Sequence, residues 1–400
     1  MHVFEGLKVL DVSSYIAGPG AATILADFGA DVIKIEPPGG DAFRTVHRNP
    51  NLAYSEHDYL WMQVARSRRG LALDLKQPDA QAVLHRLVAD ADVLITNHPL
   101  PLRVRLGLDW ARLEALNPRL IYASLTGYGE SGPEADKPGF DATTYWARSG
   151  LADLTRPDPD GPPANPANGL GDQPTAVSLY AAIVTALFRR ERTGRGGLVS
   201  TSLLANGAWA NAMALQGALV GGRIVYRQPR HVPRNALTNF YRCRDGRWFI
   251  LSLLSEERSW PPLTELLGVP QLQTDERFAT AAARRANAGA LAAQLDAAFL
   301  TRDSAQWSAL CEAQGLTVGV VARSEDALED LQMRAVGALV PGDGIPGSGL
   351  TVSSPFQVDG EEKVRPRASP AVGQHSDEVL REAGWSDSEI ASLRASGAVA

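Results

Sequence analysis

Short apolar runs alternate with amphipathic stretches along the first third of the chain. The runs at 8–13, 31–36, 71–75, 93–96 and 120–125 have the length and β-branched character of buried strands. Helical patterns follow Gly18-Pro19-Gly20 as far as Phe28, and recur at 78–90 and 109–116. Strands that alternate with helices predict an α/β fold with a parallel sheet, whose ligand sites collect where the strands end.

The pattern changes after residue 153. A loop rich in Pro, Gly and Asp covers 154–171, and two long helices are expected at about 174–191 and 200–218, separated by a glycine turn at 193–197. Beyond an irregular basic stretch, the sequence predicts a hairpin from 237–242 and 247–253, helices at 278–300 and 304–314, and two short helices at 376–384 and 386–396. This second half therefore favours a separate small domain.

Composition narrows the class of protein. A chain of 400 residues with 44% apolar and 21% charged residues is typical of a soluble globular protein of two domains. Its net charge of −6 disfavours nucleic acid and anionic membranes as partners. The start of the chain lacks the features of a signal peptide, and only Cys243 and Cys311 are present, which together predict a cytoplasmic protein without disulfides. None of the seven histidines pairs at metal-ligand spacing, so no metal site is expected.

Asp172 is the candidate catalytic residue. It follows Gly171 and stands two residues before Pro174, which suits the first turn of the helix expected there. Glycine leaves the approach to the carboxylate open, and the positive end of the helix dipole predicts that the carboxylate stays ionised and able to act as a nucleophile. An ordinary helix N-cap is the alternative interpretation.

A second motif resembles a dinucleotide-binding turn. Gly18-Pro19-Gly20-Ala21-Ala22-Thr23 follows the first strand, and Glu36 ends the second strand as a ribose-binding acid would. The match is poor because Thr23 replaces the third glycine and Pro19 lacks an N–H. A structural turn competes here with the site of a nicotinamide-dependent oxidoreductase.

Six cations occur around the third and fourth strands, and we expect them at one edge of the sheet. They are Arg66, Arg68, Arg69, Lys76, Arg103 and Arg105. In an acidic protein such a cluster suits a polyphosphate ligand, although solvated basic loops would explain it as well. Asp141, after Gly139 and Phe140, is either a helix cap or a second catalytic carboxylate.

Taken in order, these segments resemble the class III CoA-transferase family, which includes formyl-CoA transferases, carnitine CoA-transferases and α-methylacyl-CoA racemases. The similar segments are 4–11, 17–19, 28–36, 69–76, 126–129, 170–172, 193–196 and 373–380. The resemblance implies a Rossmann-like large domain from 1–222, a smaller α+β domain from 223–325, and a tail at 326–400 that returns to the large domain. It also implies a homodimer of two interlocked rings.

The resemblance assigns roles to individual residues. Asp172 becomes the nucleophile of an acyl-CoA:carboxylate CoA-transferase, with acyl-CoA and a carboxylic acid as substrates and no tightly bound cofactor. CoA would contact Ala17, Arg69, Leu73, Lys76, Asn97, His98 and Arg105, with the three cations on its phosphates. The substrate pocket would include Ile16, Phe140, Asp141 and Tyr145.

Some positions depart from the family pattern. Pro37 replaces an Arg that contacts CoA in many members, so that contact is missing or supplied by Arg44. Ile16 replaces the Gln of formyl-CoA transferases, which favours a larger, partly apolar acid over a small diacid such as oxalate. Tyr145, Trp146 and Ile16 hint at an aromatic or branched pocket wall, unless they belong to the core. Phe140 replaces the proton-transferring His of the racemases, which disfavours an acyl-CoA racemase or epimerase. A non-catalytic CoA-binding protein is a further alternative.

Overall fold

The computed structural model describes residues 2–400, and contacts divide the chain into two compact units. The first unit consists of Met1–Leu151, Asn165–Gln216 and Asp330–Ala400, and the second of Ala152–Ala164 and Gly217–Glu329. The domain boundaries near 222 and 325 inferred from the sequence stay a prediction.

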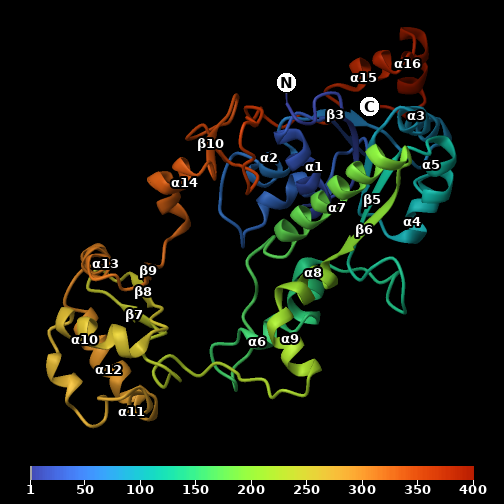
Figure 1. The fold of residues 1–400 in the computed structure, drawn as a ribbon. Helices are drawn as coiled ribbons and strands as arrows, with labels where there is room; N and C mark the ends of the chain where they lie inside the picture. Colours follow the sequence, from blue (N-terminus) through green and yellow to red (C-terminus); the bar gives the residue numbers. More distant parts are fainter. Residues whose placement is uncertain (1) are drawn as a thin grey trace. The chain divides into compact units, whose positions relative to one another are not determined.

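A six-stranded parallel sheet forms the centre of the first unit (Figure 1). Its strands are β1 (Lys8–Val12), β2 (Asp31–Glu36), β3 (Arg69–Ala72), β4 (Val93–Thr96), β5 (Ile121–Thr126) and β6 (Gly197–Ser202). They lie in the order β3-β2-β1-β4-β5-β6, and every neighbouring pair is parallel. This doubly wound order confirms the predicted α/β fold and places the carboxyl ends of the strands at one edge.

Strand β6 corrects one prediction, because a helix was expected from residue 200. Residues 197–202 pair with β5 alone, and residues 197–201 alternate between half-buried and exposed positions, as in an edge strand. The helix begins only at Leu203, where the hydroxyl of Ser202 accepts a hydrogen bond from the N–H of Ala205. β-Branched residues in a short polar strand were thus mistaken for a helix start.

Helices cover both faces of this sheet. Residues of α1 (Ala17–Asp27) and α7 (Asp172–Thr193) share one apolar core with the sheet, and residues of α3 (Pro78–Ala89), α5 (Trp110–Leu116), α15 (Ser376–Glu382) and α16 (Asp387–Ala395) share another. The first unit also contains η1 (Ala42–Arg48), α2 (Tyr59–Ala65), α4 (Leu100–Arg105), η2 (Asp141–Arg148), α8 (Leu203–Ala210), α14 (Leu331–Ala335), β10 (Leu339–Pro341) and β11 (Leu350–Val352). Two short helices, α6 (Leu151–Leu154) and α9 (Ala212–Leu219), occur where the chain passes between units.

The second unit is built on a three-stranded antiparallel sheet. Its strands are β7 (Phe240–Arg242), β8 (Trp248–Leu251) and β9 (Val318–Val320), so the predicted hairpin is confirmed and a third strand joins it. Its helices are α10 (Glu256–Leu266), η3 (Pro270–Gln273), α11 (Ala281–Ala286), α12 (Ala288–Phe299), α13 (Ser304–Ala313) and η4 (Ser324–Leu328). The stacked rings of Tyr241 and Phe299 lie in its core. Among residues 2–400, no helix combines the length and the apolar character that crossing a bilayer requires.

Candidate active site

Asp172 is the first residue of α7, and its side chain borders a cavity of about 810 Å³. The N-cap position belongs to Gly171, and no side chain caps this helix, so the N-cap interpretation of Asp172 is wrong. A Cβ at Gly171 would lie 2.4 Å from the ring of Tyr145, so only glycine fits there. The turn therefore presses against Tyr145 on one side and presents Asp172 to the cavity on the other.

The carboxyl group of Asp172 is not held as a permanent anion. Burial, and then the negative charge of Asp141, raise the pKa of Asp172 to about 7. Among the described residues no donor bonds to this carboxylate, whereas Asp141 accepts a hydrogen bond from the N–H of Gly171 at 3.5 Å. The expectation of a carboxylate kept permanently ionised is thus wrong, because burial and the like charge of Asp141 both favour the neutral form.

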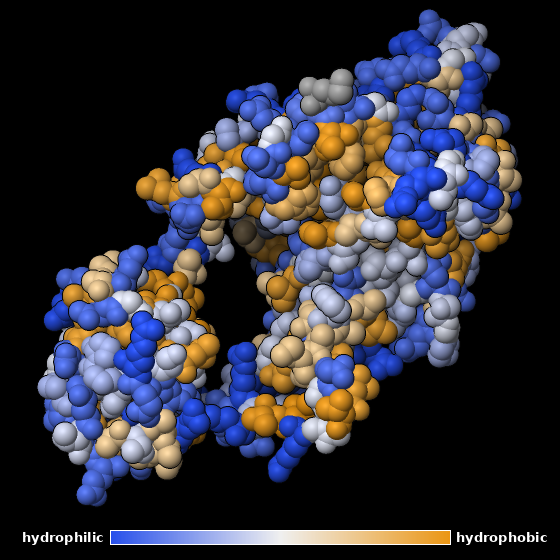
Figure 2. Space-filling view, in the orientation of Figure 1, coloured by the Kyte–Doolittle hydropathy of each residue, from blue (hydrophilic) through white to orange (hydrophobic). Residues whose placement is uncertain are grey.

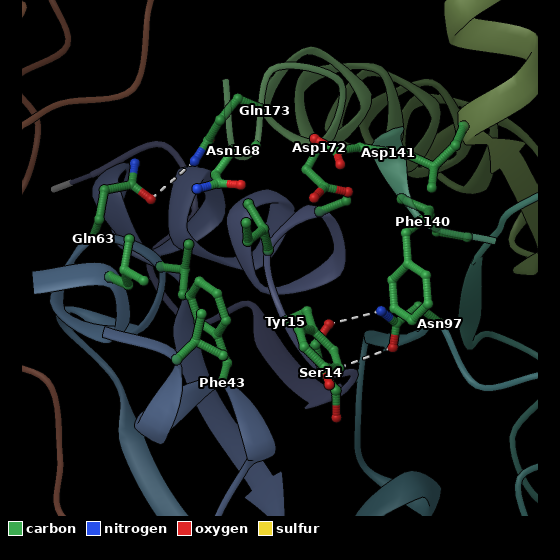
Figure 3. Close-up of a pocket in the computed structure, with 18 of the residues that line it drawn as sticks. Ser14, Tyr15, Phe43, Gln63, Asn97, Phe140, Asp141, Asn168, Asp172 and Gln173 are labelled. Carbon is green, nitrogen blue, oxygen red and sulfur yellow. Dashed lines mark hydrogen bonds between the residues drawn. The ribbon is translucent and has the colours of Figure 1, made fainter. Parts of the chain in front are cut away.

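The loop between β1 and α1 forms one wall of the cavity. The amide of Asn97 fixes this loop by accepting a hydrogen bond from the N–H of Ser14 at 2.8 Å and donating one to its carbonyl at 2.7 Å (Figure 3). The next residue, Tyr15, has a φ of +66°, a strained conformation for a side chain of this size. Its ring lies 6.0 Å from that of Phe43 and 6.2 Å from that of Phe140, between centroids. Loop geometry thus places an aromatic ring on the cavity wall.

Buried ion pairs lie next to the same loop between β1 and α1 and support it. The side chain of Lys34 is fully buried, donates to the carbonyl of Ser13, and lies 3.1 Å from Asp41 and 3.7 Å from Asp11. Arg68 pairs with Asp11 and donates to the carbonyl of Pro19 at the start of α1. A buried charge without its partner is costly, so these pairs restrict the loop to one arrangement.

The predicted cluster of six cations at one sheet edge is wrong. Four of the arginines are bound to carboxylates, in the pairs Arg66–Asp27, Arg68–Asp11, Arg69–Asp31 and Arg103–Glu130. Arg69 begins β3, so in a parallel sheet it lies at the edge opposite to the strand ends. Of the six cations, only Lys76 and Arg105 are exposed and have side-chain nitrogens without a partner among the described residues. The sequence showed the charges but not the buried acids that neutralise them.

Most of the predicted site residues meet at the cavity. Those that line it are Ile16, Ala17, Asn97, His98, Phe140, Asp141 and Asp172. Three other predicted residues do not line it. Tyr145 lies behind Gly171, and Leu73 belongs to the apolar core that the sheet shares with α3, α5, α15 and α16. Arg69 pairs with Glu378 and Glu382 in addition to Asp31. Burial first, and then the charges of Lys34 and Arg103, lower the pKa of His98 to about 4, so its ring is neutral at pH 7.

Several lining residues could not be anticipated. Phe43 and Gln63 come from η1 and α2, two elements whose pattern predicted nothing, and the amide of Gln173 donates to that of Gln63 at 3.1 Å. Tyr15 depends on an unusual φ that no sequence rule for tyrosine predicts. Lys137, in the loop after β5, could have been suspected because it follows a glycine-rich segment at a strand end.

The glycines after β1 serve packing. Residues 18–23 are buried inside α1, and a Cβ at Gly20 would lie 2.8 Å from that of Ala176 in α7. Glu36 accepts two hydrogen bonds from Arg44, each 2.8 Å, and that guanidinium also stacks on Trp61. The turn therefore cradles no pyrophosphate, and the acid expected to bind a ribose is already occupied. Both findings count against a nicotinamide site.

A parallel sheet in doubly wound order, with a buried carboxyl of raised pKa at a strand-end cavity, is the arrangement of many α/β enzymes. Comparison with known proteins is more specific. The model of CoA-transferase family III matches residues 4–376, and the chain belongs to that family. It is an enzyme of the transferase class.

Curated relatives span nearly the whole chain. The (R)-2-hydroxy-4-methylpentanoate CoA-transferase of Clostridioides difficile is 30% identical over 99% of each chain. The succinyl-CoA–D-citramalate CoA-transferase of Chloroflexus aurantiacus is 30% identical over 98% of this chain and 96% of the relative. A crystal structure of a CAIB/BAIF family protein from Brucella suis superposes with a TM-score of 0.86 at 30% identity, covering 96% of this chain and 99% of that one.

Proposed function

We propose that this enzyme transfers CoA from an acyl-CoA to a carboxylic acid through covalent intermediates on Asp172. The observation that carries the proposal is the position of the Asp172 carboxyl, at the start of α7, on the wall of the cavity and without a hydrogen-bond donor among the described residues. A poorly solvated carboxylate is a better nucleophile than one surrounded by water or N–H groups.

The chemistry would proceed in four displacements. The Asp172 carboxylate attacks the thioester carbonyl, which forms a mixed anhydride and releases the CoA thiolate. The thiolate attacks the aspartyl carbonyl, which frees the donor acid and leaves an aspartyl-CoA thioester. The acceptor carboxylate then attacks that thioester, and the released thiolate attacks the acceptor's carbonyl, which forms the new acyl-CoA and restores Asp172.

The chain contributes position and environment to these steps. Each intermediate is an activated acyl group that water would destroy, so the partly buried cavity protects it. The backbone N–H of Asp172 has no hydrogen-bond partner among the described residues and is a candidate donor to a developing oxyanion. Asp141 holds the N–H of Gly171 and so positions the turn that presents the nucleophile.

CoA would enter along the strand ends. Ala17, Asn97 and His98 line the cavity and would contact the CoA body. Lys76 and Arg105, whose side-chain nitrogens are exposed, are the cations available for its phosphates. The roles suggested for Arg69 and Leu73 have less support, since their side chains are occupied by ion pairs and by the core.

The homodimer and the cytoplasmic location belong to the same proposal. In the first unit Trp209 in α8 is 82% exposed and Met213 in α9 is 92% exposed, and Figure 2 shows apolar residues at the surface around these helices. Large exposed apolar side chains suit a surface that a second subunit covers. Cys243 and Cys311 are unpaired, which fits a reducing compartment.

One assay separates the proposal from its alternatives. A CoA thioester incubated with its own isotope-labelled acid in D2O should acquire labelled acid without deuterium at the α-carbon, and Asp172→Asn should abolish the exchange. An acyl-CoA racemase would instead introduce α-deuterium, which Phe140 cannot mediate. A non-catalytic CoA-binding protein would give neither signal, and a wild type as inactive as the variant would contradict the proposal.

A further inference from the structure

The cavity beside Asp172 has an aromatic and aliphatic side. In Figure 3 Phe43 and Gln63 lie on one side of Asp172, Phe140 and Asn97 lie on the other, and the ring of Tyr15 lies between Phe43 and Phe140. Further apolar residues line the cavity: Val46 in η1, Leu52 in the segment before α2, Tyr59, Leu60 and Met62 in α2, and Leu350 and Val352 in β11. An apolar group that enters this side leaves water for a pocket of carbon atoms.

The charges on the cavity wall are as informative as its apolar residues. Lys137 is the one lysine or arginine among the described residues that line the cavity, and it pairs with Glu134 at 2.8 Å. His98 is neutral, and the cavity wall otherwise offers uncharged amides, which include the linked pair Gln63 and Gln173 as well as Asn49 and Asn168. The two carboxyl groups on the wall, Asp141 and Asp172, add negative charge.

A dicarboxylic acid would be poorly accommodated here. One carboxylate takes part in the chemistry at Asp172, so the second would enter an apolar space that lacks a free cation. Amides can donate hydrogen bonds to it but cannot neutralise it, and Asp141 would repel it. An apolar chain end of the same shape meets none of these costs.

We propose that the acyl group handled by this enzyme belongs to a monocarboxylic acid with an aromatic or branched apolar chain, whose end packs against the rings of Tyr15 and Phe43. The inference rests on the proposed CoA transfer and specifies its substrate class. The cavity of about 810 Å³ is large enough for such a chain together with the end of a pantetheine arm. The strained backbone of Tyr15 is then explained by what its ring contacts.

The test compares two acids of nearly the same shape. Glutarate and 5-methylhexanoate differ by the exchange of one terminal carboxylate for an isopropyl group. Each thioester is incubated with its own isotope-labelled acid, so that no second substrate has to be known. We expect kcat/KM for exchange to be at least about 10-fold higher with 5-methylhexanoyl-CoA.

A charge-introducing variant makes the test sharper. Gln63→Arg places a cation on the apolar side and should shift the ratio of the two rates towards glutaryl-CoA by about 10-fold or more, whereas the matched variant Gln63→Met should leave the ratio near that of the wild type. Equal or faster glutaryl exchange in the wild type would overturn this inference and leave CoA transfer intact. Absence of exchange with both thioesters, with no modification of Asp172, would overturn the proposed function and this inference together.

Discussion

Asp141 forms a hydrogen bond to the turn before Asp172 and also raises the pKa of Asp172. The carboxylate of Asp141 accepts a hydrogen bond from the N–H of Gly171, and Figure 3 shows this carboxylate beside the carboxyl group of Asp172. Burial is the larger cause of the pKa of about 7, and the charge of Asp141 adds to it. The position of Asp172 therefore brings its pKa close to neutral pH, as the proposed role as nucleophile requires.

The first prediction concerns pH. The proposed reaction uses the carboxylate form of Asp172, whose pKa is about 7, so kcat/KM should rise about 10-fold per pH unit below pH 7 and level off above it. Asp141→Asn removes a like charge, so the midpoint should move to lower pH while remaining above the value of about 4 for an exposed Asp. A pH profile of kcat/KM for both proteins measures this, and a midpoint unchanged by Asp141→Asn would contradict it.

The second prediction concerns stability. The pKa of Asp172 is higher in the folded state than in the unfolded chain, so the folded state loses stability as pH rises above about 4, by up to about 4 kcal/mol beyond pH 7. Asp172→Asn removes this cost. Thermal unfolding of the variant should therefore occur at higher temperature than that of the wild type at pH 8 and at a similar temperature at pH 4. A variant that unfolds earlier at pH 8 would show that the carboxylate is a structural group.

The third prediction concerns Tyr15. Tyr15→Gly relieves a positive φ and removes the ring, so the free energy of unfolding should stay within about 1 kcal/mol of the wild type while KM for an apolar acid rises about 10-fold. Tyr15→Phe keeps the ring and should behave like the wild type in both measurements. An unchanged KM in Tyr15→Gly would mean that the ring does not contact the acyl group.

The fourth prediction concerns the phosphates of CoA. Arg105→Ala should weaken CoA binding by about 5- to 10-fold at low salt, and the difference should shrink as ionic strength rises. Arg195→Ala is the matched control, because Arg195 is also exposed and its guanidinium has no partner among the described residues, but it precedes β6 at the opposite edge of the sheet. Isothermal titration with CoA compares them, and equal affinities would exclude Arg105 from the phosphate site.

The sheet could be predicted because its strands are short apolar runs with clear breaks. The run at 31–36 and the run at 93–96 match β2 and β4 residue for residue. Strand β6 was not predicted, because a polar edge strand lacks a continuous apolar run and because its pairing with β5 is a long-range contact.

The candidate site could be predicted from sequence only where its residues are close together along the chain. Gly171 and Asp172 are adjacent in sequence, so the glycine before the carboxylate was visible, whereas the clash with Tyr145 that requires this glycine was not. The raised pKa depends on Asp141, which approaches from 31 residues away, and on the walls around both groups. The pairing of Arg68 with Asp11 likewise links β1 to the segment before β3, which no local pattern reveals.

The central claim is that Asp172 becomes acylated during turnover, and hydroxylamine trapping tests it most directly. The enzyme is incubated with CoA thioesters of apolar monocarboxylic acids and hydroxylamine, digested, and analysed by mass spectrometry. We predict a hydroxamate on Asp172 that requires the thioester and is missing from Asp172→Asn. A peptide containing Asp172 that stays unmodified while CoA transfer proceeds would contradict the account.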